Sequence, residues 1–452
     1  MTTEQVEEKV RETLRAVALD GVRAPGDLAE KVVRRRGRRR FSQAAGAAVA
    51  VTAITVGAVF GIGGGGAAER DRPVRTAASP EGWKPWKSDV TGATERGCLV
   101  DGSALYCSGS EYDVAKLDAN TGERLWTVKV NREGDGIDHP FAVRDGVVYA
   151  YRNHTAKKQP NGDYMGGTDL MAVDARTGER LWAVEMPQDD RGRRAAMLID
   201  GAVLANTPSL RTMSALDPRT GKEKWHHTWA KGIVCQRAVL SGVPYLLCTR
   251  DTEEPHDTDV FRLDPATGTA KKVTTVPGRQ QLVGTSGDRM ILGEMKDVAG
   301  KDRQLTFVSS SGQQTSHPYR IEGSPARADV VGDLLISVSW QGKASAYSLT
   351  TGKTLWTGPV GVKMPGKTSM LDIASPVVSA GQGVVYFFGG TGDLSGLDLR
   401  TGERVWRGHV DIPRLGPGPG IRNPPQLLLY EDVLIARDGG SKLVSLLPRI
   451  GD

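Results

Sequence analysis

Short runs of alternating apolar and polar residues, each ended by a turn sequence, fill the chain after about residue 80. Residues 141–143 and 147–149 are two such runs, and they flank Asp145-Gly146. Asp-Gly between two apolar runs is the strongest short signal for a β-hairpin. Few long amphipathic stretches follow residue 70, and the chain contains 56 Gly and 24 Pro. This pattern predicts a turn-rich, all-β protein.

A longer unit, Ala-x-Asp-x-x-Thr-Gly-x-x-x-Trp, recurs through residues 81–452. Its Gly supplies a turn position with positive φ, its Asp and Thr can bond nearby backbone groups, and its Trp falls in the returning strand. The glycines are spaced by 56, 43, 47, 44, 40, 50 and 49 residues and are Gly122, Gly178, Gly221, Gly268, Gly312, Gly352, Gly402 and Gly451. Repeats of this length, with two hairpins each, predict eight four-stranded blades of a β-propeller.

The eighth repeat stops at its turn, so its blade lacks the outer strand that carries Trp in the other repeats. The segment Gly82–Lys87, with Trp83 and Trp86, is the unassigned segment of that character. We expect it to complete the eighth blade and close the ring, which leaves no open sheet edge. Pro85 is tolerable there because an outer strand is an edge strand.

The repeated unit resembles the tryptophan-docking motif of the pyrroloquinoline-quinone (PQQ) dehydrogenase-like propellers, over about residues 81–452. The resemblance implies that the Trp of each unit packs between neighbouring blades. The matching residues are Trp126, Trp182, Trp225, Trp356 and Trp406. The fourth repeat has Lys272 in place of Trp and the fifth is degenerate, which implies a weaker seam at blades four and five.

The resemblance in fold does not imply quinone-dependent catalysis. Dehydrogenases of that family typically use a disulfide between adjacent cysteines, a catalytic Asp, and calcium held by Glu, Asn and Asp. None of the four cysteines here is adjacent to another, and no HExxH motif or His-Asp-Ser grouping occurs. The acidic loop at residues 251–259 lacks the spacing of a calcium loop and is interpreted as solvated. We therefore expect no catalytic residue, no cofactor and no metal.

Cys235 and Cys248 flank a hairpin with the two-residue turn Ser241-Gly242. Counting outward from Leu240 opposite Val243 places the two cysteines directly opposite each other. The same count places them at a non-hydrogen-bonded pair, where the strands are closest and a disulfide fits. An extracytoplasmic location permits the oxidation.

A second cysteine pair, Cys98 and Cys107, flanks Asp101-Gly102 in a similar way. These two align if the intervening loop is four residues long, so we expect a second disulfide. The alternative for both pairs is free, buried thiols. Metal binding is disfavoured because no His or second Cys falls at ligand spacing.

The stretch from residue 41 to residue 68 contains no charged residue, and 44–62 is almost continuously apolar or small. About 20 such residues cross a hydrocarbon core roughly 30 Å thick as one helix. The basic cluster Lys31–Arg40 precedes it, which predicts an N-terminus inside and a propeller outside the cytoplasmic membrane. The expected domains are a cytoplasmic amphipathic and basic segment, a transmembrane helix, a flexible linker and the propeller, at 1–40, 41–64, 65–80 and 81–452.

Two interpretations of this N-terminal region stay open. The sequence Arg38–Phe41 resembles a twin-arginine signal, so the propeller is either anchored or exported with a cleaved signal. The first 40 residues are either a solvated stalk or the output segment of a one-pass signalling protein. They hold 11 Lys/Arg against 7 Asp/Glu, and this accounts for most of the net charge of +6. The rest of the chain is nearly neutral, so a basic arm beside the membrane explains the charge better than a nucleic-acid surface does, and we expect no nucleic-acid partner.

The tight Asp-Gly and Thr-Gly turns alternate with longer connections, which propeller topology gathers on the opposite face. The predicted long connections are 152–168, 187–194, 250–258, 294–303, 360–370 and 411–424. We expect them to form a face that binds a protein or a small ligand, with Tyr164, Arg414 and Arg422 as contacts. The leading function is a non-catalytic binding propeller, either scaffold or sensor. The alternative is a PQQ-dependent oxidoreductase.

Overall fold

The computed structural model describes residues 77–129, 139–158, 164–187, 196–252, 254, 256–294, 303–319, 325–364, 373–411 and 424–450. The predicted cytoplasmic segment and transmembrane helix, and most of the predicted linker, lie outside these residues. Among the described residues, no helix has the length and apolar character needed to cross a membrane.

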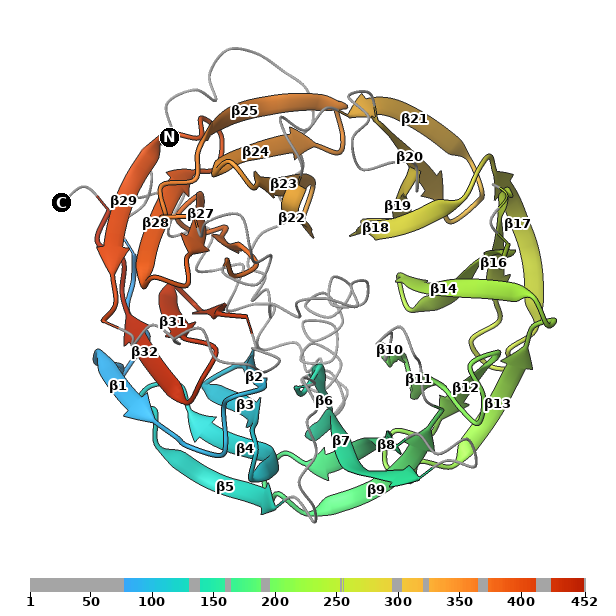
Figure 1. Cartoon of the computed structure of the whole chain (residues 1–452), viewed down its shortest axis with the longest axis horizontal. Coiled ribbons are helices and arrows are strands. Elements are labelled where there is room, and N and C mark those ends of the chain that lie inside the picture. The colour runs from blue at the N-terminus through green and yellow to red at the C-terminus, as the bar shows by residue number, and fades with distance from the viewer. Residues whose placement is uncertain are drawn as a thin grey trace, which may run out of the picture. The chain divides into compact units, whose positions relative to one another are not determined.

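The described residues form eight four-stranded antiparallel sheets arranged as the blades of a ring (Figure 1). The innermost strands are β2 (Gly97–Asp101), β6 (Ala142–Arg144), β10 (Met197–Ile199), β14 (Ile233–Leu240), β18 (Gln280–Ser286), β22 (Pro325–Val331), β26 (Val377–Ser379) and β30 (Gln426–Tyr430). The second strands are β3 (Ala104–Ser108), β7 (Val147–Lys158), β11 (Ala202–Asn206), β15 (Val243–Arg250), β19 (Arg289–Glu294), β23 (Leu334–Ser339), β27 (Val384–Phe388) and β31 (Val433–Arg437).

The third strands are β4 (Tyr112–Asp118), β8 (Tyr164–Asp174), β12 (Thr212–Leu216), β16 (Thr258–Leu263), β20 (Arg303–Ser309), β24 (Lys343–Ser348), β28 (Asp393–Asp398) and β32 (Lys442–Leu446). The outermost strands are β5 (Arg124–Lys129), β9 (Arg180–Met186), β13 (Glu223–Thr228), β17 (Ala270–Val276), β21 (Gln314–Tyr319), β25 (Lys353–Pro359), β29 (Arg404–His409) and β1 (Trp86–Asp89). The predicted eight-bladed, four-stranded architecture is confirmed.

The hairpin turns follow from their residues. Asp145 and Gly146 have φ of 50° and 74°, and the strands pair from Arg144↔Val147 outward. Two consecutive positive φ values match the right-handed twist of the flanking strands, and Asp-Gly adopts them at low strain. The Asp-Gly signal therefore sets the register of this hairpin.

The apolar core lies between the blades. Each of the hydrophobic clusters combines side chains from two neighbouring blades, as where Leu105 and Leu117 of the first blade meet Leu428 and Ile435 of the eighth. Both faces of each sheet are thus buried against a neighbour, and no single blade holds a core of its own. The ring is the unit that buries apolar surface.

The repeated Trp docks on the next blade in a fixed way. The Trp126 Nε1–H donates to the carbonyl of Ala175 at 3.3 Å, and a Cβ added to Gly178 would lie 2.8 Å from the Trp126 ring. The same bond joins Trp182 to Pro218, Trp225 to Pro265 and Trp356 to Leu399, at 3.0, 2.8 and 2.9 Å. Each Gly therefore serves a turn with positive φ and also leaves room for an indole ring.

Two seams replace the indole with another side chain. Lys272, at the expected Trp position, points instead to Asp259 with an N–O distance of 2.7 Å. Val273 takes the place against Gly312, and His317 takes it against Gly352. Trp406 packs edge-on against Tyr386 with ring centroids 5.8 Å apart, and its partner glycine, Gly451, lies outside the described residues.

The N-terminal strand closes the ring, as predicted. β1 pairs antiparallel with β32, from Trp86↔Ser445 to Asp89↔Lys442 (Figure 1). The strand starts at Trp86, slightly later than the predicted segment. The Trp86 Nε1–H donates to the carbonyl of Ala119 at 3.0 Å, and its ring covers Gly122. Trp86 is therefore the docking tryptophan of the eighth blade.

Candidate functional site

The connections between strands divide between two faces of the propeller. Within each of the first seven blades the first and second strands, and the third and fourth, are joined at one end, which we call the tight-turn face. In the eighth blade the turn between β30 and β31 lies at this end, and the fourth strand is the N-terminal β1. The second and third strands, and successive blades, are joined at the other end, the long-loop face. Loops presented by a rigid scaffold are the usual place for binding residues.

One predicted loop of the long-loop face is a β-hairpin instead. Residues 152–168 were expected to form a connection, but β7 continues to Lys158 and β8 begins at Tyr164, which pair with each other. The prediction missed these strands because the segment lacks the alternation of apolar and polar residues that marks a packed strand. Tyr164 thus begins β8 at the far end of this hairpin. Arg414 and Arg422 lie outside the described residues.

Long polar side chains join the innermost strands of neighbouring blades. The amide of Gln236 on β14 accepts from the backbone N–H of Leu282 at 2.9 Å and donates to the carbonyl of Gln280 at 2.8 Å, both on β18. Gln426 on β30 makes the same pair of bonds with the N–H and carbonyl of Cys98, at 2.8 and 2.7 Å. Each amide thereby replaces a partner strand and satisfies an otherwise free sheet edge.

Arg327 stands at the equivalent position of β22, four residues before the end of the strand, as do the two glutamines. Its guanidinium donates to the Ser375 hydroxyl at 3.0 Å and to the Ile373 carbonyl at 3.2 Å, both in the next blade. Three of the inner seams are therefore held by the protein's own side chains.

A fully buried arginine holds two blade-to-blade connections. Arg437, at the end of β31, is 1% exposed. Its Nη1 donates to the Glu95 carbonyl at 3.0 Å and its Nη2 to the Pro424 carbonyl at 2.8 Å. Burial lowers the pKa of Arg437 to about 10, against the opposing effect of Asp438 and Glu95. The side chain stays charged at neutral pH and clamps the segments that enter the first and eighth blades.

A buried carboxyl lies at the seam of the first and second blades. Asp113 occupies a bulge in β4 and is 2% exposed. Burial raises the pKa of Asp113 to about 7, although the guanidiniums of Arg152 and Arg96 act in the opposite direction. Arg152 is paired with Asp169 in its own blade at 3.8 Å. Because Asp113 is enclosed, its ionisation affects the stability of this seam.

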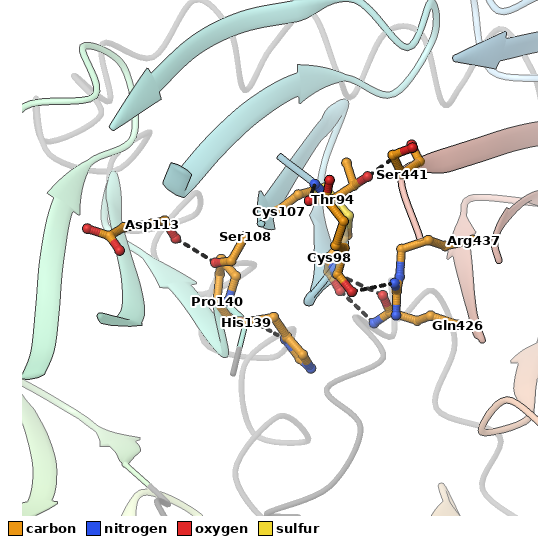
Figure 2. Close-up of a disulfide and its surroundings, with 11 residues drawn as sticks. Thr94, Cys98, Cys107, Ser108, Asp113, His139, Pro140, Gln426, Arg437 and Ser441 are labelled. Atoms are coloured by element: carbon orange, nitrogen blue, oxygen red, sulfur yellow. Dashed lines mark hydrogen bonds between the residues drawn. A yellow bond between two sulfur atoms is a disulfide. The ribbon is translucent and has the colours of Figure 1, made fainter. Parts of the chain in front are cut away.

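Both predicted disulfides are present. Cys235 pairs with Cys248 and Cys98 with Cys107, in each case across a hairpin with a Cα–Cα distance of 4.0 Å. Figure 2 shows the second bridge beside Gln426 and Arg437, at the seam where the ring closes. The short distance between Cys235 and Cys248 fits the close pair predicted from the Ser241-Gly242 turn. Cys98 and Cys107 align across the two-residue turn Gly102-Ser103, because Asp101 pairs with Ala104, and not across the four-residue loop that was expected.

One well-formed connection of the long-loop face exposes a large apolar side chain. Leu210, between β11 and β12, is 46% exposed. The buried Asn206 amide donates to the carbonyls of Leu210 and Thr212 at 3.2 and 3.0 Å, so the backbone that presents Leu210 is fixed from below. The sequence held a signal for it, because an isolated Leu stands in a polar turn after Pro208. Leu210 is a candidate binding residue that the sequence analysis did not name.

Within the described ranges, no group of three His, Cys, Asp or Glu side chains is placed to hold a metal ion. In the acidic loop, Asp257 accepts the backbone N–H of Gly278 at 2.9 Å, and Asp259 accepts the Thr275 hydroxyl at 2.9 Å. His226 bonds Glu223 at 2.8 Å, and Glu223 in turn accepts from Ser214 at 2.8 Å. Because the carboxylate stands between the two, the histidine cannot activate that serine.

The chain resembles known propellers along most of its length. A family model described as outer membrane protein assembly factor BamB matches residues 70–236 and 256–452. The outer membrane protein assembly factor BamB of Burkholderia pseudomallei (strain K96243) is 25% identical over 366 residues, which are 75% of this chain and 81% of that protein.

Two further similarities are more limited. The dehydrogenase subunit of a quinone alcohol dehydrogenase from Acetobacter aceti is 31% identical over 146 residues, 28% of this chain and 18% of that one. The crystal structure of the computationally designed Ika8 protein superposes with a TM-score of 0.51 at 14% identity, over 78% of this chain and 96% of the other. The latter similarity concerns the fold alone.

Proposed function

Because the chain belongs to the family of the outer membrane protein assembly factor BamB, we propose that it is a non-catalytic propeller that binds other proteins. The helix predicted at residues 41–64 holds it on the outer side of the cytoplasmic membrane, where it serves as a scaffold. The name of its relative, an assembly factor, supports a role in bringing envelope proteins together.

This proposal rests on the observation that the residues of the family motif pack neighbouring blades together. The docking tryptophans bond backbone carbonyls of the next blade, and their glycines make room for the indole rings. Inner-strand side chains such as Gln236 and Gln426 are engaged in bonds between blades. These two inner-strand amides thus hold neighbouring blades together.

The binding surface that we assign is the long-loop face around Leu210. Hydrogen bonds already hold the backbone at Leu210, so a partner can bury this apolar side chain without the entropic cost of ordering the loop. Such a residue suits protein recognition. The neighbouring Pro208 and Arg211 are exposed as well. A partner with an apolar patch and an acidic rim fits this loop.

The experiment is photo-crosslinking of the full chain in intact cells, with a photoreactive amino acid at residue 210 or at residue 355. Leu355, on β25 at the outer rim, is 46% exposed, as Leu210 is, so it is a matched control. We expect a discrete protein adduct from residue 210 and none of comparable yield from residue 355. Equal yields from both positions, or adducts from residue 355 alone, would refute the assignment of the face.

The alternative function, quinone-dependent oxidation, is favoured by the partial match to the Acetobacter aceti subunit. That match spans less than a third of this chain. Each of the four cysteines is bonded across its own hairpin, so none forms the adjacent-cysteine disulfide that the quinoprotein dehydrogenases use. The non-catalytic function accounts for more of the chain.

A further inference from the structure

The path of the chain into the propeller fixes which face it enters from. β32 runs from the long-loop face at Lys442 to the tight-turn face at Leu446, because it follows β31 and precedes the last turn. β1 is antiparallel to it, so Trp86, opposite Ser445, lies at the tight-turn end. Asp89 lies at the long-loop end, from which the chain continues into β2. The polypeptide thus enters β1 from the tight-turn face.

Contacts before β1 extend this path away from the ring. The Trp83 Nε1–H donates to the Ser445 hydroxyl at 2.8 Å. The backbone N–H of Ala78 donates to the Asp432 carboxylate at 3.2 Å. Asp432 belongs to the turn between β30 and β31, one of the tight turns. The first described residues are therefore fastened to the tight-turn face of the eighth blade.

From these contacts we infer that the tight-turn face of the propeller faces the membrane and that the long-loop face, with Leu210, points away from it. The inference rests on the proposed anchor at residues 41–64. About 13 residues separate that segment from Ala78. Thirteen residues with random-coil dimensions span about 20 Å on average. This short tether keeps the face to which it is fastened nearest to the lipid.

The orientation names the kind of partner that the scaffold takes. A surface turned away from the anchoring membrane meets proteins that stand further out in the envelope, or that project upward from the same membrane past the propeller. Proteins that lie flat on the lipid surface meet the tight-turn face instead. With this orientation, the distance of a protein from the membrane decides which face of the propeller it can contact.

Energy transfer from a fluorophore on the propeller to acceptor-labelled lipid headgroups tests the inference on the full chain in vesicles. The four cysteines of the chain are all in disulfides, so one added cysteine is the sole labelling site. R211C and R219C are a matched pair, since both residues are exposed arginines at opposite ends of β12. Their heights above the lipid differ by about 15–20 Å, since the five residues of β12 rise about 3.3 Å each and both arginines lie just beyond its ends.

A second pair across the ring, G390C and R400C at the two ends of β28, detects tilt. We expect transfer from R219C and R400C to exceed that from R211C and G390C at least about twofold, given this difference in height. If the protein floats with the vesicles but energy transfer is equal at the two ends of each strand, or reversed, the proposed orientation is wrong and the proposed anchor is not affected. A chain that does not float with vesicles would overturn both, and flotation separates the two failures.

Discussion

The contact by which Trp86 closes the ring leads to a quantitative prediction for Trp86→Ala. Trp86 is half-buried, and its indole N–H bonds the carbonyl of Ala119, which is fully buried. Truncating a buried Trp costs about 3–5 kcal/mol, and partial exposure reduces this. Losing the hydrogen bond adds about 1 kcal/mol. The substitution should weaken the attachment of β1 by about 2–4 kcal/mol.

Trypsin cleavage after Lys87 measures this attachment, because Lys87 lies within β1 and is paired with Val444. When cleavage follows the population of the detached strand, 2–4 kcal/mol raises the rate between about 30-fold and several hundred-fold. Mass spectrometry of the new N-terminus at Ser88 reports the rate. A synthetic peptide of residues 80–94, with and without the substitution, corrects for the intrinsic preference of trypsin.

Trp126→Ala is the matched control, since Trp126 makes the same contact at a seam within the continuous chain. It should leave cleavage after Lys87 nearly unchanged. The reasoning fails if Trp126→Ala accelerates this cleavage as much as Trp86→Ala does. It also fails if Trp86→Ala has no effect, because the ring would then be closed by other contacts.

Three further substitutions test the seams, each by thermal or denaturant unfolding of the full chain in detergent. Gly178→Ala should destabilise by at least about 1 kcal/mol more than Gly201→Ala, because both have φ near 75° but only Gly178 lies against an indole ring; equal losses would contradict the double role of the glycine. Gln236→Leu should lower the free energy of unfolding by about 1–3 kcal/mol, because two backbone groups of the next blade lose their partner, whereas Gln281→Leu at an exposed position should be nearly neutral. Similar effects of the two substitutions would show that the Gln236 bonds do not stabilise the protein. Burial raises the folded-state pKa of Asp113 to about 7, so the stability gained from its protonated form is complete below about pH 4 and is lost as the pH rises toward 7. Asp113→Asn should remove this part of the pH dependence of unfolding and stabilise the protein at pH 8. An unchanged pH profile would contradict the burial argument.

The sequence was most informative where a local rule fixes a residue. The Asp145-Gly146 and Ser241-Gly242 turns set hairpin register, and counting from the second one gave the Cys235–Cys248 pairing. These features depend on residues close together in the chain, where turn geometry decides the outcome.

Contacts between blades were harder to predict from the sequence. The docking role of Trp86 follows from a ring closure that joins residues far apart in sequence, and Gln426 bonds Cys98 across the same seam. The two strands that extend to Lys158 and from Tyr164 carry no apolar alternation, so pattern alone placed a loop there. The predicted contacts Arg414 and Arg422 fall outside the described residues and stay predictions.

We propose that the repeated motif packs blades together and that the propeller works without a quinone. Titration of the full chain with pyrroloquinoline quinone and Ca²⁺, followed by calorimetry and by dye-linked oxidation of alcohols and sugars, tests it most directly. We expect no saturable binding and no dye reduction above that of the free quinone. Tight stoichiometric binding together with turnover of an alcohol or a sugar would contradict it.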